Sequence, residues 1–225
     1  MRDKEQFEVV FTDGWSEDER AAYLVDVQSR HMESTFFLRA FAPSPFHWHF
    51  HQAYEALQKD LFLPGVSGLL NGIEASIRTS LCELEGRPLD GDQGTVMSNR
   101  LLREARDAGI DTSVLAFPDE DDFAEKVSSN NRADAVRLVR VRNNICHGNF
   151  QGYVQSHPEM GTFFTPECLA PISARLLEIS FAWARELARF KHDAAMGSPV
   201  VDDLTPPSNP LAQWLDEDDP IAQDS

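Results

Sequence analysis

The stretch Val66–Leu84, VSGLLNGIEASIRTSLCEL, decides the class of this fold. Its apolar residues recur at intervals of three and four, at Val66, Leu70, Ile73, Ile77, Leu81 and Leu84. That spacing places one apolar stripe along an α-helix. A second long stripe begins near Pro166 or Pro171 and runs to about Asp193, with Leu169, Ile172, Leu176, Ile179, Trp183, Leu187 and Phe190 in period. Because no βαβ alternation accompanies them, these helices predict an all-α bundle.

Shorter helices are expected around these two. Ser16 followed by Glu19 is a capping-box pattern, and it predicts a helix that runs to about Phe41, before Pro43 and Pro45. Further helices are predicted over about 47–61, 98–108, 119–128 and 131–146. Pro64-Gly65 predicts a kink or a new helix start, and the Gly-, Pro- and Asp-rich stretch 85–97 predicts a loop. Only Phe7–Phe11 resembles a strand.

Composition and charge exclude several classes of protein. Of 225 residues, 42% are hydrophobic, which suffices for a core, but no apolar run reaches the roughly 18 residues of a membrane helix. We also expect no secretory signal, and three cysteines without metal-like spacing favour the cytoplasm. The net charge of −17 argues against whole-surface binding to nucleic acid or anionic lipid. Any activity on nucleic acid therefore needs a local basic patch.

The last 29 residues, 197–225, differ from the rest of the chain. They contain seven acids, five prolines and no Lys or Arg, a composition that predicts a largely disordered, acidic tail. The predicted organisation is an N-terminal extension over 1–14, a helical domain over 15–196 and this tail. Within it, the apolar segment Pro210–Leu215 docks on a partner or on its own domain, or it stays flexible; we favour the flexible tail.

Residues 130–150, NNRADAVRLVRVRNNICHGNF, form the basic exception to the acidic chain. On a helix of about 100° per residue, Leu138, Val141 and Ile145 cluster within about 60° as the buried stripe. Arg142 falls at the edge of that stripe, where a buried arginine needs a partner or a wet cavity. Arg137, Arg140 and Asn144 point elsewhere and are expected to be solvated.

His147 lies about 140° around a continuous helix from Arg142, so the two share a face only if the helix ends between them or long side chains converge. Gly148 supplies such an end, since glycine permits the left-handed turn that redirects the histidine. Alternatively, two copies of the chain meet here, and the histidine of one faces the arginine of the other.

The segment Arg142-Asn143-Asn144-Ile145-Cys146-His147-Gly148 resembles the R-N-x-x-x-H motif of HEPN domains, which are small all-helical domains. Val66–Leu84 is similar to the long second helix of that family, and the resemblance in helix order covers about 15–192. It implies a HEPN-like helical bundle that acts as a metal-independent endoribonuclease without a cofactor. It also implies a homodimer, with both motifs facing a composite cleft, in a toxin–antitoxin or phage-defence setting with an antitoxin or regulatory partner.

The resemblance further implies a role for each residue. Arg142 binds the scissile phosphate and stabilises its developing charge, His147 is the general acid or base, and Asn143 orients the pair by hydrogen bonding. The RNA's own 2′-hydroxyl is the nucleophile, which leaves a 2′,3′-cyclic phosphate and a 5′-hydroxyl. Arg137, Arg140 and Asn144 are the candidates for further RNA contacts.

Simpler readings stand beside this one. Arg142 and His147 near a helix end also suit the negative end of the helix dipole, and Asn143 also suits a local cap. A HEPN-like module without catalysis, acting by interaction or regulation, is the alternative function.

Two other clusters suggest metal chemistry. His47, His49 and His51 share a face only on a strand, and we expect structural or surface histidines rather than a metal site. The acids of Asp119–Asp122 suggest a two-metal nuclease, but we expect them to open a helix, where acids favour the dipole. Cys146 beside His147 points about 100° away on a helix, which argues against a thiol protease.

Overall fold

The computed structural model describes residues 14–42, 44–88, 96–157, 161–196 and 204–215. Helices dominate these ranges, and the prediction of an all-α fold is confirmed. The helices are α1 (Glu17–Ser34), α2 (Phe36–Phe41), α3 (His47–Leu57), α4 (Phe62–Leu84), α5 (Asn99–Asp107), α6 (Phe123–Ser128), α7 (Arg137–Cys146) and α8 (Ala170–Asp193). Five short 3-10 turns accompany them: η1 (Thr112–Leu115), η2 (Arg132–Asp134), η3 (Gln151–Tyr153), η4 (Pro166–Leu169) and η6 (Ala212–Trp214).

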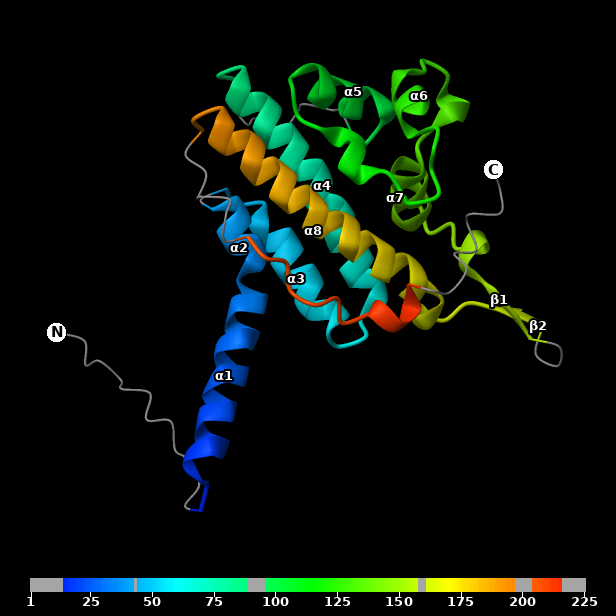
Figure 1. Cartoon of the computed structure of the whole chain (residues 1–225). Coiled ribbons are helices and arrows are strands. Elements are labelled where there is room, and N and C mark those ends of the chain that lie inside the picture. Colours follow the sequence, from blue (N-terminus) through cyan, green and yellow to red (C-terminus); the bar gives the residue numbers. More distant parts are fainter. Residues whose placement is uncertain (1–13, 43, 89–95, 158–160, 197–203, 216–225) are drawn as a thin grey trace.

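The two long helices α4 and α8 pack together at the centre of the bundle (Figure 1). Both apolar stripes predicted for them are buried, as Leu70, Ile73 and Leu187 illustrate. The indole Nε1 of Trp183 on α8 donates to Ser76 Oγ on α4 at 2.8 Å, and that hydroxyl donates to the carbonyl of Ile73 at 2.8 Å. The Trp183 N–H and the Ser76 hydroxyl are therefore both satisfied, so this contact carries no desolvation penalty of its own.

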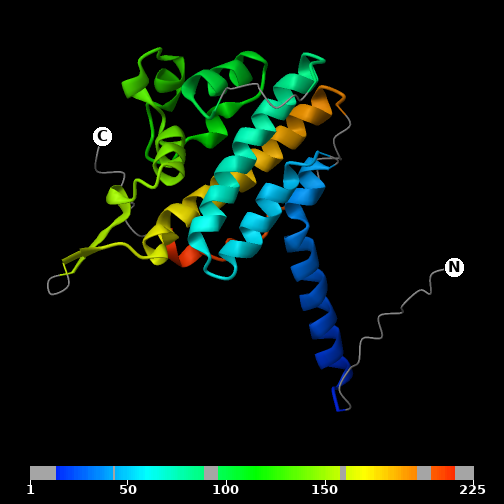
Figure 2. The same ribbon diagram turned by 180° about the vertical axis from the view of Figure 1, so that it is seen from behind.

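Helix α3 lies against α4, most clearly in the view from behind (Figure 2). Three glycines of α4 face it. A Cβ added at Gly68 would lie 2.8 Å from the Cβ of Ala53, and one at Gly72 would lie 2.8 Å from the ring of Phe50. Since real Cβ atoms do not approach so closely, the close packing of this pair depends on glycine at those positions.

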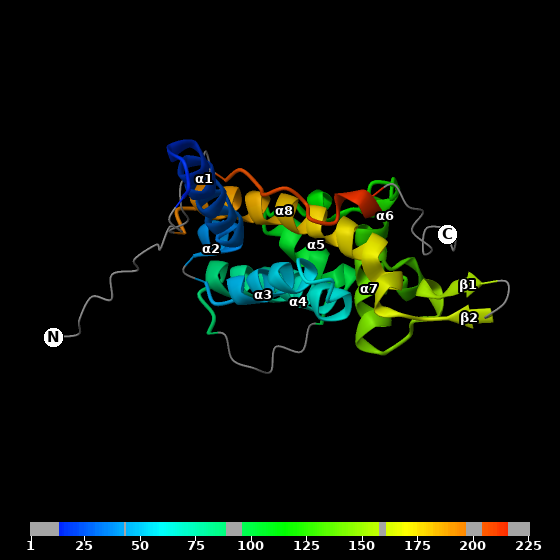
Figure 3. The ribbon, with the colours of Figure 1, turned by 90° about the horizontal axis from the view of Figure 1, so that it is seen from below.

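Helix α1 projects away from the bundle at one end, and the hairpin projects at the other (Figure 3). The capping box is confirmed: the amide of Ser16 donates to Glu19 Oε2 at 2.7 Å, and the amide of Glu19 donates to Ser16 Oγ at 3.2 Å. The Ser16 hydroxyl also donates to Glu19 Oε2, at 2.9 Å, and the two bonds that this carboxylate accepts, from the Ser16 amide first and from the hydroxyl, lower the pKa of Glu19. The helix breaks at Thr35, however, so the single predicted helix to Phe41 is two helices.

Several predicted boundaries are corrected. Helix α3 ends at Leu57 rather than near 61, because Asp60 takes a left-handed conformation with φ of 56°. The new start indicated by Pro64-Gly65 lies at Phe62, and Pro64 sits in the first turn, where its missing N–H costs no hydrogen bond. Helices α6 and α7 begin later than predicted, and extended residues Ala135 and Val136 separate η2 from α7.

A short antiparallel hairpin was not predicted. Strands β1 (Gln155–His157) and β2 (Gly161–Phe163) pair with Ser156 opposite Thr162. The strand suggested at Phe7–Phe11 lies outside the described residues, as do 1–13 and the loop residues 89–95.

Part of the C-terminal segment is not a free tail. Residues 204–215 run along α8 (Figure 1), with Leu204 and Leu211 buried. The Asn209 amide donates to the carbonyl of Ala174 at 3.1 Å and to Glu178 Oε1 at 2.9 Å, and Arg175 donates to the carbonyl of Leu215. The preference for a flexible Pro210–Leu215 segment is therefore wrong, and this segment docks on its own domain. Residues 197–203 and 216–225 lie outside the described ranges.

Candidate functional site

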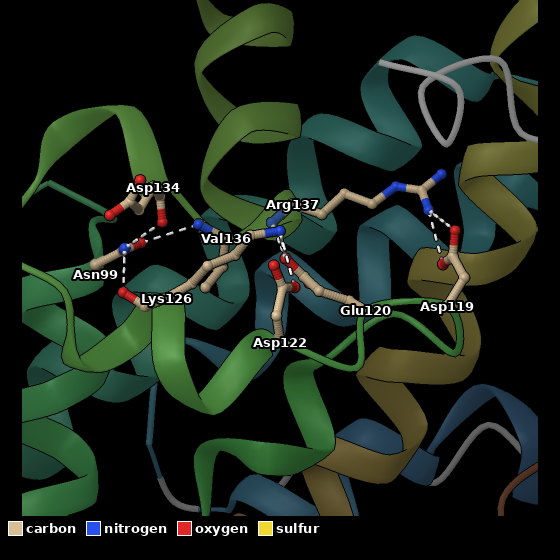
Figure 4. Close-up of polar contacts among 8 residues, drawn as sticks. All are labelled: Asn99, Asp119, Glu120, Asp122, Lys126, Asp134, Val136 and Arg137. Carbon is tan, nitrogen blue, oxygen red and sulfur yellow. Dashed lines mark hydrogen bonds and ion pairs between the residues drawn. The ribbon is translucent and has the colours of Figure 1, made fainter. Parts of the chain in front are cut away.

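Helix α7 carries the motif, and its first turn is fixed by acids that precede α6. The backbone N–H of Arg137 donates to Glu120 Oε1 at 2.7 Å (Figure 4). The Arg137 Nη1 group donates to both carboxylate oxygens of Asp119, at 2.8 and 2.7 Å, and the guanidinium lies 4.5 Å from the ring centroid of Phe117. Arg137 is only 4% exposed, so the expectation of a solvated Arg137 is wrong.

The side chain of Asn99 joins three segments at the same end of α7 (Figure 4). Its Nδ2 group donates to the carbonyls of Lys126 and Asp134, at 2.8 and 2.9 Å, and its Oδ1 accepts from the N–H of Val136 at 3.1 Å. This amide satisfies the backbone of the extended residues before α7, which explains why the helix begins at Arg137 and not near residue 131.

The acids of Asp119–Asp122 lie directly before α6, as predicted, with Asp122 as its N-cap residue, and three of them also bind other groups. Asp119 binds Arg137, Glu120 is buried and binds the start of α7, and Lys126 Nζ lies 2.9 Å from Asp122 Oδ1. Helix α6 begins only at Phe123. Within the described residues, no group of three or more His, Cys, Asp or Glu side chains is placed to hold a metal ion.

The middle of α7 confirms the helical-face prediction. Leu138, Val141 and Ile145 are buried, and Arg142 lies at the edge of that stripe with 15% of its side chain exposed. Its partner is Glu74 on α4, whose Oε2 lies 3.2 Å from both Nε and Nη2 of Arg142. Arg78 Nη1 lies 3.6 Å from the other Glu74 oxygen. Two arginines thus offset the cost of burying one carboxylate.

Glu74 is the residue of this site that the sequence reasoning missed. Its carboxylate is the only acid on the apolar face of Val66–Leu84, four residues after Leu70 and three before Ile77. A lone charged residue on a buried helix face is a signal for a charged partner elsewhere in the fold. The partner could not be identified from the sequence, because Arg142 lies 68 residues away.

Helix α7 ends as Gly148 predicts. Gly148 has φ of +68°, and the N–H of Asn149 donates to the carbonyl of Asn144 at 2.8 Å, which closes the helix end. The Asn149 amide also donates to Asn144 Oδ1 at 3.2 Å, so Asn144 helps to shape this turn. His147 is the C-terminal capping residue and its side chain is exposed. An exposed imidazole at the end of a helix is open to a bound substrate.

Asn143 and Arg140 occupy other surroundings. Within the described residues, the Asn143 side chain forms no hydrogen bond with Arg142 or His147, so the expected orienting contact is not seen. Asn143 instead lines a cavity of about 620 Å³ beside α5. Arg140 is half-buried, and its Nε is enclosed without a hydrogen-bond partner among the described atoms. Arg140 is thus less solvated than the helical projection predicts.

The three clustered histidines lie on α3 and have different surroundings. His47 is buried, and its Nδ1 lies 2.7 Å from the carbonyl of Ser44, while His49 is exposed on α3. His51 Nε2 lies 3.5 Å from Glu55. The cysteines Cys82, Cys146 and Cys168 are free thiols, and only Cys146 is exposed. Each of these histidines has an ordinary place in the helix bundle.

Comparison of the chain with protein-family models, with curated proteins and with solved structures found no match. None of the described helices is both long enough and apolar enough to cross a membrane.

Proposed function

We propose that this protein is a HEPN-type, metal-independent endoribonuclease that acts in the cytoplasm as a homodimer. One observation carries the proposal: Arg142 is held at the edge of the core by Glu74, and His147 is exposed at the glycine-terminated end of the same helix. A fixed guanidinium and an accessible imidazole are the two groups that cleavage of an RNA phosphodiester needs. A role in RNA cleavage also explains why the charged Arg142 lies at the edge of the core.

The division of labour between these groups follows from their contacts. Arg142 uses Nε and Nη2 on Glu74, and within the described residues its Nη1 forms no hydrogen bond. Nη1 is therefore not committed to an acceptor among the described residues and can serve a phosphate oxygen, and the fixed geometry requires little reorganisation. Glu74 thus acts as a positioning residue for Arg142.

The reaction uses the RNA as its own nucleophile. The 2′-oxygen attacks phosphorus while the bond from phosphorus to the 5′-oxygen breaks, which leaves a 2′,3′-cyclic phosphate and a 5′-hydroxyl. His147 takes the proton from the 2′-hydroxyl or gives a proton to the departing 5′-oxygen. In a homodimer with two motifs across one cleft, the two His147 side chains divide these tasks.

RNA binding must overcome the chain's net charge of −17. Arg137 is committed to Asp119 and is not part of the proposed RNA contact. Arg140 and Asn144 remain candidates, and dimerisation doubles the local positive charge of the motif. Binding that depends on so few cations falls steeply with added salt. An antitoxin or other regulatory partner of this ribonuclease is part of the proposal.

The test is cleavage of tRNA, mRNA and ribosomal RNA in excess EDTA, with analysis of the product ends. Wild-type protein is expected to leave cyclic-phosphate ends, and His147→Ala to lose at least about 100-fold in rate. His49→Ala is the matched control, since His49 is an exposed histidine on α3. Equal rates for wild type and His147→Ala contradict the proposal, and so does inhibition by EDTA.

A non-catalytic interaction module is the second candidate, and the ion pair itself favours it. Arg142 and Glu74 satisfy each other, so the pair has a purely structural use. Helix α1, which projects from the bundle, also exposes apolar side chains, including Leu24 at 49% and Val25 at 67%. Absence of cleavage by the wild type and by protein shortened at Leu215 supports this module over the ribonuclease.

A further inference from the structure

A second feature of α7 lies on the face that carries Val139 and Asn143. Together with the start of α5 and residues 129–131, this face lines the open cavity of about 620 Å³. Neither Arg142 nor His147 lines it. The volume falls within the range of about 300–1,000 Å³ that small-molecule sites occupy. The cavity is therefore large enough to be a binding site of its own.

The lining combines an apolar wall with positive charge. Met97 and Val139 supply buried apolar surface, and Arg100 and Arg103 reach the cavity from successive turns of α5. No Asp or Glu is among the described lining residues, although acids outnumber bases 37 to 20 in the chain. A pocket of this composition selects a ligand that has both a flat or apolar body and a negative group.

The polar groups of the cavity fall into two sets. Asn99 is bound to backbone groups, and Asn131 to the N–H of Ala133 and the Asp134 carboxylate, so both build the wall. Asn130 and Asn143 form no side-chain hydrogen bonds within the described part of the chain, although both line the cavity. Arg103 uses Nη1 on the carbonyl of Ser128 at 3.2 Å, and Arg100 uses Nε on Glu104 at 2.8 Å. Among the described residues, the cavity thus contains two amides without hydrogen bonds and two guanidinium groups that each use only one nitrogen.

We propose that this cavity binds one nucleotide unit, with the base against Met97 and Val139 and the phosphate on Arg100 and Arg103. A free carboxamide offers a donor beside an acceptor, which matches the edge of a base, and Asn143 is placed to read that edge. Guanidinium groups match phosphate oxygens and also stack on bases. The unit comes from an RNA strand or from a free nucleotide. In the first case, the inference rests on the proposed ribonuclease, since the next residue of α7 after Arg142 is Asn143.

Titration calorimetry of the full chain carrying His147→Ala tests the pocket, because this variant leaves an RNA ligand uncut. The probes are AMP, GMP, CMP and UMP, with ribose 5-phosphate and inorganic phosphate as ligands without a base. At least one mononucleotide is expected to bind with one-to-one stoichiometry and at least about 10-fold more tightly than either control ligand.

Three variants locate the bound nucleotide. Arg100→Gln, which removes the guanidinium, and Asn143→Leu, which removes the amide, are each expected to weaken binding at least about 10-fold. Arg106→Gln is the matched control, since Arg106 is exposed on the same helix and does not line the cavity. It should change binding less than about twofold. Arg100 is 73% exposed, so its replacement leaves the fold intact even if other variants lose stability.

The ligand's source is read from a trinucleotide. Tighter binding of the trinucleotide than of its mononucleotides assigns the pocket to an RNA strand, and equal binding assigns it to a free nucleotide. Saturable binding without any RNA cleavage by the wild type means that the ribonuclease proposal fails while the pocket stands. The pocket is overturned if no mononucleotide saturates below about 10 mM. An equal effect of Arg106→Gln, or equal affinity for inorganic phosphate, also overturns it.

Discussion

The two ends of helix α7 use the same residue types in opposite ways. At its start, Arg137 is 4% exposed and both its backbone and its side chain are bound by the neighbouring acids Glu120 and Asp119. In the second half of the helix, Arg142 has a single acidic partner, and at the end itself His147 is exposed beside a left-handed glycine. The start is thus fixed by neighbouring segments, and the end is held on one side only.

This difference separates structural charge from charge that remains available. An arginine that is buried and bound to an acid cannot bind a ligand without losing stability. An arginine that is held by an ion pair on one side of its guanidinium can still bind a ligand through the other side. Arg137 and Arg142 lie five residues apart on one helix, and they illustrate these two conditions. The number of basic residues on a helix therefore does not show how many of them can bind a ligand.

The largest expected effect separates the two arginines by activity. Arg142→Lys keeps the charge beside Glu74 but loses the planar fork, so cleavage should fall by about 10²–10³-fold. Arg137→Lys should lower stability and leave the rate per folded molecule unchanged. Rates in excess EDTA and denaturant midpoints measure both effects. A large loss of cleavage in folded Arg137→Lys would overturn the comparison.

The fixed start of α7 should be sensitive to Asn99. Asn99→Ala leaves the carbonyls of Lys126 and Asp134 and the N–H of Val136 without this partner, and we expect a loss of about 3 kcal/mol. Urea unfolding measures the free energy. Asn130→Ala, at an exposed position nearby, should change it by less than about 0.5 kcal/mol. Similar losses in the two variants would show that the Asn99 network does not hold this end.

The single contact at the other end is measured by a double-mutant cycle. Arg142→Ala, Glu74→Gln and the double variant should reveal a coupling of about 2 kcal/mol, because the ion pair is largely buried. Arg78 keeps Glu74 partly compensated in Arg142→Ala, which limits the loss. The free energies of unfolding of the wild type and the three variants, measured in urea, give the coupling. Additive effects would mean that Glu74 does not position Arg142.

The smallest expected effect on stability tests whether the turn at the end of α7 contributes to cleavage. Gly148→Ala and Gly86→Ala each place a Cβ at positive φ, +68° and +62°, and neither Cβ meets an atom within 4 Å. Each should therefore cost about 1 kcal/mol through backbone strain alone. Only Gly148→Ala should also lower cleavage, since it shifts the turn beside His147. Equal cleavage by the two variants would separate the turn from the activity.

Much of the motif helix follows from local pattern. Periodicity located Leu138, Val141 and Ile145 on the buried face, placed Arg142 at its edge, and Gly148 marked the helix end. The residues that contact this helix do not follow from the local pattern. Asp119 and Asn99 contact the helix from segments 18 or more residues away, and no sequence periodicity links them to it.

The sequence by itself determined the helices, their buried faces and the R-N-x-x-x-H segment, because these depend on local spacing and backbone preference. Only the tertiary structure decided that Arg137 is buried against Asp119, that Glu74 holds Arg142, and that residues 204–215 dock on α8. The cavity beside Asn143 is likewise a product of three segments meeting. Contacts between distant segments depend on shape and charge in three dimensions, and a one-dimensional pattern does not carry either.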